Sequence, residues 1–238
     1  MVEISAVVFD MYGTLTPNWP KSVWDDQKRA SAAPLAFSED AWITALDATW
    51  HERVTGSLGS LTETFRAVAI QAGLAEPTAE QLAEAVELRY AAYRGAQELR
   101  PDAIDTLRAL RANGFKIALV SDCTHELADQ WDGLVLAEFF DASVFSCYEG
   151  TRKPDQKLFL AAATRLGVLP ETCLYVGDGG GDELAGSSAV GMHSVLLAAE
   201  DWAASHAPGR PETKWTGLRA GTLSQVPAII TELTATAT

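Results

Sequence analysis

The chain has 238 residues, of which 47% are hydrophobic and 21% charged, a composition that predicts a folded protein with a packed core and excludes a disordered or fibrous chain. This length suffices for one well-cored domain with a large insertion, or for two small domains. The formal net charge of −14 excludes nucleic acid and anionic membranes as expected partners but not a small anionic substrate, because local cations act at short range.

The cysteines and the N-terminal segment indicate where the protein works. Cys123, Cys147 and Cys173 form no CxxC pair and leave an odd thiol, which favours a reducing compartment over a disulfide framework. The chain begins without a basic segment followed by an apolar run, and it contains no apolar stretch near the roughly 18 residues of a membrane span. We expect a cytoplasmic protein, as a monomer or a homodimer.

The first predicted element is a strand over residues 4–9, a short and β-branched apolar run that suits a strand buried on both faces. It ends at Asp10. Pro17, Pro20 and Pro34 then interrupt the chain, and from about residue 39 to residue 94 apolar residues recur at helical spacing without a convincing strand.

After Pro101 the pattern alternates between helix and strand. Helices are predicted up to residue 113 and over 125–131, 156–166, 183–190 and 224–233, and strands over 116–120, 143–145, 172–176 and 194–197. Alternation of this kind predicts an α/β fold with a Rossmann-like, doubly wound parallel sheet. Residues 1–17 and 98–238 would form the core and residues 18–97 an inserted α-helical cap domain, with a loop over 203–212.

Polar residues follow the predicted strands. Asp10 follows the first strand, Ser121 and Asp122 follow the second core strand, Lys153 comes shortly after the third, and Asp178 follows the fourth. Ligands of open parallel sheets bind at the carboxyl ends of the strands. Any one of these residues alone would most often be a helix cap or turn residue, but polar residues at all of these junctions predict a site.

Four segments carry a family resemblance: FDMYGTLT at 9–16, VSD at 120–122, RKPD at 152–155 and VGDGGGDELAG at 176–186. In this order and spacing the chain resembles the haloacid dehalogenase superfamily of hydrolases. The helical insertion after the first segment is similar to the small helical cap of that family.

The resemblance implies that Asp10 is the nucleophile. A carboxylate at a strand end, faced by the N–H groups of a tight turn at 11–14, can approach an electrophilic centre while those donors receive displaced charge. Ser121 would hydrogen-bond the oxygens of the bound group, and Lys153 would neutralise charge on nucleophile and ligand rather than being a solvated surface lysine. The remaining core residues expected at the substrate are Asp122, Gly13 and Thr14.

The same resemblance implies a Mg²⁺ site. Asp10, Asp178 and the backbone carbonyl of Tyr12 would ligate the ion in the family pattern. A further acid comes from downstream, either Asp182 or Glu183, because two ways of aligning the last motif differ by one residue. A plain helix N-terminus carrying two acids is the alternative interpretation.

Tyr12 decides between the functions that the family offers. Phosphatases of the family usually carry a second aspartate at this position to protonate the leaving group, whereas 2-haloacid dehalogenases carry DxYGTL, as here. The acidic cluster favours a cation, so our first hypothesis is a magnesium-dependent phosphatase of a small phosphate monoester acting through an aspartyl-phosphate. The alternatives are a metal-independent 2-haloacid dehalogenase, then a phosphonate hydrolase with a cap lysine (Lys21 or Lys28), or a non-catalytic binding module.

The cap is expected to select the substrate. Arg53 is the candidate for a contact to a substrate anion, although a surface arginine would look the same in the sequence. The tryptophans of this region line an apolar pocket or pack between cap helices; they are Trp19, Trp24, Trp42 and Trp50.

Overall fold

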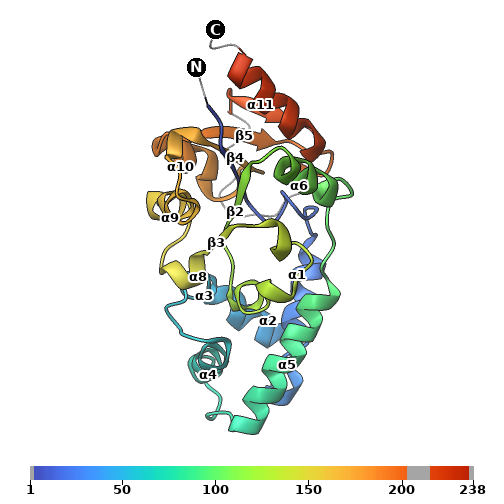
Figure 1. Ribbon diagram of the computed structural model, residues 1–238. Helices are drawn as coiled ribbons and strands as arrows, with labels where there is room; N and C mark the ends of the chain where they lie inside the picture. Colours follow the sequence, from blue (N-terminus) through green and yellow to red (C-terminus); the bar gives the residue numbers. More distant parts are fainter. Residues whose placement is uncertain (1–2, 203–214, 236–238) are drawn as a thin grey trace.

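The structure is a computed structural model that describes residues 3–202 and 215–235. Its centre is a parallel sheet in the order β3-β2-β1-β4-β5-β6 (Figure 1), which confirms the predicted Rossmann-like fold. The strands are β1 (Ala6–Phe9), β2 (Lys116–Ser121), β3 (Ala142–Phe145), β4 (Cys173–Gly177), β5 (His193–Leu197) and β6 (Leu218–Ala220).

Both faces of β1 are buried, as its unbroken apolar sequence predicts. Val7 and Phe9 pack on one side with helices α6 (Ala103–Ala112) and α11 (Val226–Ala235). The alternate residues Ala6 and Val8 pack on the other side with α9 (Gln156–Leu166) and α10 (Glu183–Ala189). Helices therefore cover the sheet on two faces (Figure 1).

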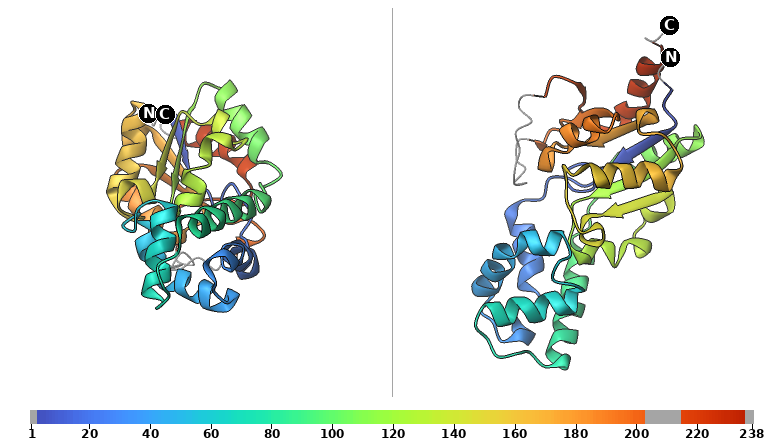
Figure 2. Two further views of the ribbon diagram at one scale, coloured as in Figure 1. Left: turned by 90° about the horizontal axis from the view of Figure 1, so that it is seen from below. Right: turned by 90° about the vertical axis from the view of Figure 1, so that its left-hand side faces the viewer.

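A second unit of helices lies beyond the carboxyl ends of β1 and β2 (Figure 2). It has its own hydrophobic cluster, built around Trp42, Phe65 and Leu82. Two of its helices begin at capping boxes, Ser60 with Glu63 and Thr78 with Gln81. The helices are α1 (Lys21–Arg29), α2 (Glu39–Ala48), α3 (Trp50–Val54), α4 (Leu61–Gln71) and α5 (Ala79–Gly95).

Some elements differ from the sequence prediction. Helix α1 was not expected among the prolines, yet Pro20 directly precedes its first turn, where a missing N–H is harmless. Helix α7 (His125–Ala128) ends before residue 131, where the predicted helix ended, and α8 (Ser146–Glu149) and the three-residue edge strand β6 were not predicted. The loop predicted over 203–212 lies outside the described residues.

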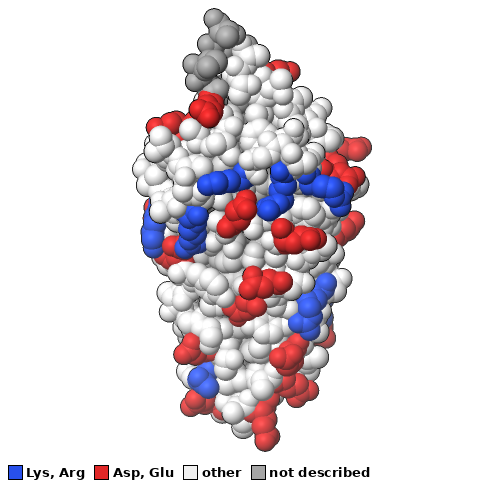
Figure 3. All heavy atoms as spheres, viewed as in Figure 1, with Lys and Arg blue, Asp and Glu red and all other residues white. Residues whose placement is uncertain are grey.

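The surface agrees with an acidic chain that carries local cations. On the face in Figure 3, acidic side chains gather at the cap end, while several Lys and Arg side chains lie in a band across the core. Among the described helices, none has both the length and the apolar character needed to cross a bilayer.

Gly186 in α10 provides a test of how tightly this helix packs. A Cβ there would lie 2.7 Å from Phe159 Cε2 and 2.7 Å from the Pro154 carbonyl oxygen. We expect Gly186→Ala to lower the free energy of unfolding by about 1–3 kcal/mol, because both contacts are too short for a Cβ and involve a backbone oxygen and the fully buried Phe159 ring. Gly95→Ala at the end of α5 is the control: a Cβ there meets nothing within 4 Å, so stability should hold or rise by about 0.5–1 kcal/mol. Urea denaturation measures both variants. A Gly186→Ala protein as stable as the unchanged protein would contradict this packing.

Candidate active site

Strand register gathers the predicted residues at one edge of the sheet. Phe9 pairs with Leu119 on β2 and with Val176 on β4, and the Asp10 N–H donates to the Val176 carbonyl at 3.0 Å. The carboxyl ends of the three strands are therefore level. Asp10, Ser121 and Asp178 follow or end these strands and meet at this edge.

Lys153 lies inside this group and not at the surface. It is 3% exposed, and its Nζ lies 2.6 Å from Asp10 Oδ1 and 2.5 Å from Glu183 Oε2. Burial would lower the pKa of the ammonium, but the charges of Asp10 and Glu183 overcome that effect and raise the pKa well above its ordinary value. Lys153 is thus a buried cation shared by two carboxylates.

Asp10 is oriented at both carboxylate oxygens. Lys153 holds Oδ1, and the Thr14 hydroxyl donates to Oδ2 at 3.1 Å. Burial raises the pKa of Asp10, the charge of Asp178 raises it further, and Lys153 opposes both effects. A carboxylate fixed in this way at a strand end has the placement that a nucleophile needs.

The turn after Asp10 differs in one respect from the expectation. The Gly13 N–H donates to Thr16 Oγ1 at 3.2 Å, and the Thr14 N–H donates to the Met11 carbonyl at 3.3 Å. Both donors are engaged inside the turn, so Thr14 contacts the site through its hydroxyl instead.

Gly13 is required at this turn for the space it leaves. Its φ is 79°, and a Cβ there would lie 2.4 Å from Asp178 Oδ2. Only glycine lets the turn approach this carboxylate so closely. Gly13 therefore permits the contact between the first and the fourth motif.

Three buried carboxylates lie together at this edge. One ligand atom from each of Asp10, Asp178 and Glu183 can be chosen so that all lie within 4.8 Å of one another. Among the described residues, the cation that contacts this group is the Lys153 ammonium, so the buried carboxylates outnumber the positive charge placed beside them there. Hard carboxylate oxygens are the donors that Mg²⁺ prefers, so this set fits a divalent cation.

The two acids of the last motif have different positions. Glu183 begins α10 and is fully buried: Oε1 accepts the Gly179 N–H at 2.8 Å, and Oε2 accepts Lys153 and the Tyr175 hydroxyl at 2.7 Å. Asp182 has a left-handed φ of 54° and is not one of the three clustered carboxylates. Glu183 is thus the acid of the last motif that joins Asp10 and Asp178 in the cluster, and its bonds to Lys153, Tyr175 and Gly179 also fix the lysine.

Ser121 and Asp122 follow β2 but play different parts. Ser121 is buried, and its Oγ has no hydrogen-bond partner in the part of the chain that the structure describes. A buried hydroxyl left unpaired costs about 1–3 kcal/mol, so this oxygen is suited to a ligand. Asp122 Oδ1 accepts the Lys153 backbone N–H at 2.9 Å, so it fixes the lysine rather than pointing only at a substrate.

The Tyr12 side chain joins the core to the cap. Its hydroxyl lies 2.9 Å from the hydroxyl of Tyr93 on α5, and its ring packs against Trp19 at 5.5 Å and Trp24 at 5.0 Å. Burial, reinforced by Tyr93, raises the Tyr12 pKa well above its ordinary value. Tyr12 is therefore a poor proton donor at neutral pH.

The other two cap tryptophans are explained by packing. Trp42 lies in the cap core against Phe65, and Trp50 stacks under Arg152, whose guanidinium carbon is 5.2 Å from the ring centroid. Of these four tryptophans, only Trp19 and Trp24 therefore adjoin the turn at residues 11–14, through Tyr12. We call this turn the nucleophile turn, after the role expected of Asp10.

Arg53 is buried in the cap and is not a surface residue. Its Nε and Nη2 donate to the Leu46 carbonyl at 3.2 and 3.0 Å. Burial lowers its pKa to about 10. Much of its hydrogen-bonding capacity thus serves the cap itself, and a contact to a substrate anion stays a prediction.

Two supporting residues were not found from the sequence. Tyr175, inside β4, looks like a core residue, and nothing in the pattern shows that its hydroxyl reaches Glu183. Arg100 donates to the Thr14 and Gly13 carbonyls at 3.0 and 2.8 Å and pairs with Asp201 at 2.9 Å. Its only sequence signal is its place just before Pro101, where the chain returns from the cap.

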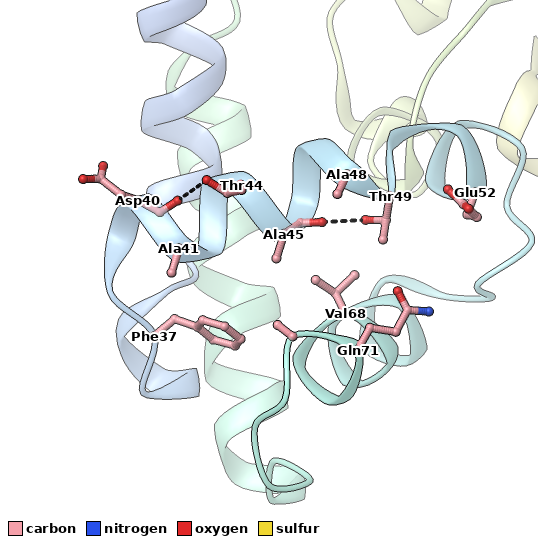
Figure 4. A pocket seen from close by; sticks show the side chains of 11 residues that line it. Phe37, Asp40, Ala41, Thr44, Ala45, Ala48, Thr49, Glu52, Val68 and Gln71 are labelled. Carbon is pink, nitrogen blue, oxygen red and sulfur yellow. Dashed lines mark hydrogen bonds between the residues drawn. The ribbon is translucent and has the colours of Figure 1, made fainter.

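A cavity of about 660 Å³ is separate from this site. It lies in the cap between α2 and α4, among small side chains such as Ala45 and Ala48, with Phe37 and Val68 facing it (Figure 4). None of the clustered carboxylates lines it. The candidate active site is therefore the charged strand edge.

The comparisons with known proteins agree with this geometry. The family model of haloacid dehalogenase-like hydrolases matches residues 4–189. The chain belongs to this family. The match includes the nucleophile turn, the cap and all four motifs, so the resemblance read from the motifs is confirmed.

Individual relatives carry names of both chemistries. A segment of 101 residues is 42% identical to a glyceraldehyde 3-phosphate phosphatase of Methanopyrus kandleri, and it spans 41% of this chain and 42% of that protein. The structure resembles a haloacid dehalogenase-type phosphatase of Thermococcus onnurineus (23% identity, TM-score 0.64, 95% and 98% coverage). It also resembles a 2-haloacid dehalogenase of Pseudomonas syringae (22% identity, TM-score 0.68, 97% and 99% coverage). At these identities the two structures show the common fold alone.

The buried lysine gives a prediction about stability. We expect Lys153→Met to lower the free energy of unfolding by about 3–5 kcal/mol at pH 8 in EDTA, because it leaves buried carboxylates without their counter-charge. The loss should be smaller at pH 5.5: burial raises the pKa values of Asp10 and Glu183, so acid protonates them in the folded state and removes the repulsion.

The matched control is Lys157→Met, since that lysine is largely exposed on α9 and its removal should change stability by less than about 0.5 kcal/mol. Guanidinium denaturation at the two pH values makes the measurement. A Lys153→Met deficit that does not change with pH would contradict the charge argument.

Proposed function

We propose that this protein is a magnesium-dependent phosphatase that hydrolyses small phosphate monoesters through an aspartyl-phosphate on Asp10. The observation that carries the proposal is the gathering of three buried carboxylates, Asp10, Asp178 and Glu183, with the Lys153 ammonium bonded to two of them. A divalent cation beside such a group would reduce the repulsion among its carboxylates. The name of the Methanopyrus kandleri relative is in line with this chemistry.

Each residue has a role in the proposed reaction. A carboxylate oxygen of Asp10 bonds to phosphorus while the ester P–O bond breaks; water then attacks phosphorus, releases phosphate and regenerates Asp10. Lys153 offsets charge on the nucleophile and the phosphoryl oxygens, and the free Ser121 hydroxyl donates to one of those oxygens. Asp10 and Asp178, with the Tyr12 carbonyl, would hold Mg²⁺, which would supply positive charge between the nucleophile and the anionic substrate.

The leaving group is protonated by water in this proposal. The Tyr12 hydroxyl is bound to Tyr93, and its raised pKa makes it a poor acid. The enzyme should therefore prefer esters whose leaving groups need little protonation.

Tyr12 also carries the second candidate, a metal-independent 2-haloacid dehalogenase, because displaced halide needs no proton. The three clustered carboxylates oppose it, since a metal-free site would retain their mutual repulsion. A phosphonate hydrolase is less well supported: Lys21 pairs with Asp25, and Lys28 pairs with Asp25 and Asp47, so both candidate lysines are engaged along the cap surface.

The setting of the enzyme belongs to the same proposal. The buried carboxylates favour Mg²⁺ as the ion, and with it a small anionic substrate. The three free cysteines favour the cytoplasm as the compartment. The division into a core (1–17 and 98–238) and a cap (18–97) is supported by the separate hydrophobic cluster of the cap helices.

Phosphate release tests the function. We expect the purified protein to release phosphate from p-nitrophenyl phosphate with added Mg²⁺, to lose that activity in EDTA, and to lose it in Asp10→Asn. Asp132→Asn, an exposed residue beyond α7, is the control and should behave like the unchanged protein. Activity unaffected by EDTA, combined with halide release from 2-haloacids, would favour the dehalogenase instead.

A second test replaces the missing acid. Tyr12→Asp should raise turnover of alkyl phosphates more than that of aryl phosphates, by up to the roughly 10²–10⁴-fold typical of general acid catalysis. The comparison controls for binding, because both substrate types share the phosphoryl group. An equal change for both would mean that protonation of the leaving group does not limit the rate.

A further inference from the structure

A second buried charge cluster lies between cap and core. Arg89 on α5 donates through Nε to Glu126 Oε1 of α7 at 2.7 Å, and both side chains are buried. The charge of the buried Arg53 of α3 also acts on Glu126 and, with Arg89, lowers its pKa. The arginine cluster, formed by Arg53, Arg89 and Glu126, therefore holds two guanidinium groups and one carboxylate, with Asp47 and Glu52 also acting on Arg53.

Hydrogen bonding in this cluster is incomplete. Arg89 Nη1 is buried and has no hydrogen-bond partner among the described residues. Glu126 does not serve it: Oε1 accepts the Arg89 Nε instead, and Oε2 accepts the Thr124 hydroxyl. A buried guanidinium donor without an acceptor is unfavourable, and an anion is the ligand that would satisfy it.

The cluster lies on the cap side of the candidate active site. Glu126 is on the short helix that follows β2 and Ser121, so it is at the same edge of the sheet as Asp10. Tyr93, one turn after Arg89 on α5, bonds to Tyr12 in the nucleophile turn. Arg89 and Asp10 are each 4% exposed. Arg89 is therefore no more deeply buried than the proposed nucleophile, which a substrate has to reach.

We propose that Arg89, with Arg53 beside it, binds a second anionic group of the substrate while Asp10 attacks the phosphoryl group. The substrate class is then a phosphate monoester that also carries a carboxylate or a second phosphate. Glu126 orients Arg89, and the free Nη1 donor receives the anion. This inference rests on the proposed phosphatase function.

Matched substrates isolate the second anion. 2-Phosphoglycolate and 2-hydroxyethyl phosphate differ only in a carboxylate against a hydroxymethyl group, and 3-phosphoglycerate and glycerol 3-phosphate differ in the same way at a longer spacing. In at least one pair we expect kcat/KM to be about tenfold or more higher for the acid, as a charge-assisted hydrogen bond allows.

Arg89→Lys is the decisive variant, because lysine keeps a cation for Glu126 but lacks the second guanidinium arm. The preference for the acid should disappear through a raised KM, while the hydroxymethyl substrate keeps its kcat/KM. Arg94→Lys is the control on the same helix: its Nη1 bonds to Gln130 at an exposed position, so the preference should persist.

The outcomes separate the subsite from the function. Equal loss on both substrates, or no preference in the unchanged protein, overturns the subsite and leaves the phosphatase. The Asp10→Asn protein provides a readout without turnover: calorimetry should show that Arg89→Lys weakens phosphoglycolate or phosphoglycerate binding about tenfold in that background. If binding weakens in this way but the protein with Asp10 intact releases no phosphate, the subsite is retained and the phosphatase is rejected. If binding does not change, the subsite is rejected.

Discussion

The Lys153 ammonium, buried between Asp10 and Glu183, is the interaction on which the site depends. Its position is set from several elements. Asp122, which follows β2, accepts the Lys153 backbone N–H. Tyr175 on β4 and the Gly179 N–H both donate to Glu183 and fix its carboxylate. A buried cation bonded to this extent can hold the Asp10 carboxylate in one orientation.

Among the described residues, three buried carboxylates gather around one ammonium, and this gathering links the fold to the proposed chemistry. Parallel register brings strand ends together whatever residues they carry, so a sequence that places acids at these ends concentrates negative charge. In the proposed function a divalent cation would offset the negative charge that Lys153 leaves. The glycine at position 13 lets the first and last motifs come close enough for that purpose.

The cap is connected to this site through the nucleophile turn. Tyr12 bonds to Tyr93 on the last cap helix, and Arg100, where the chain returns to the core, holds two carbonyls of the turn. The arginine cluster lies along the same helix. A substrate that contacts the cap would therefore lie near the turn that follows Asp10.

The fold was predictable because its signals are local. Buried strands appear as apolar runs, and an acid after each strand marks the edge where ligands bind. Helix α1 and strand β6 were missed because one begins among prolines and the other has three residues.

The site was predictable only in part, because side-chain direction depends on tertiary contacts. The motifs placed Asp10, Lys153 and Asp178 at one edge of the sheet. They did not decide whether Asp182 or Glu183 joins the acidic cluster, because the glycine turn before these two residues has no periodic signal in the sequence. The Arg89–Glu126 pair joins residues 37 positions apart on different units, which no local pattern reveals.

The measurement that most directly tests the account is calorimetric titration of Mg²⁺ into metal-free protein. The account predicts one site per chain, lost in Asp178→Asn and retained in Asp182→Asn, because only the first carboxylate belongs to the buried cluster. Absence of binding to the unchanged protein, or equal binding by the Asp178→Asn variant, would contradict it.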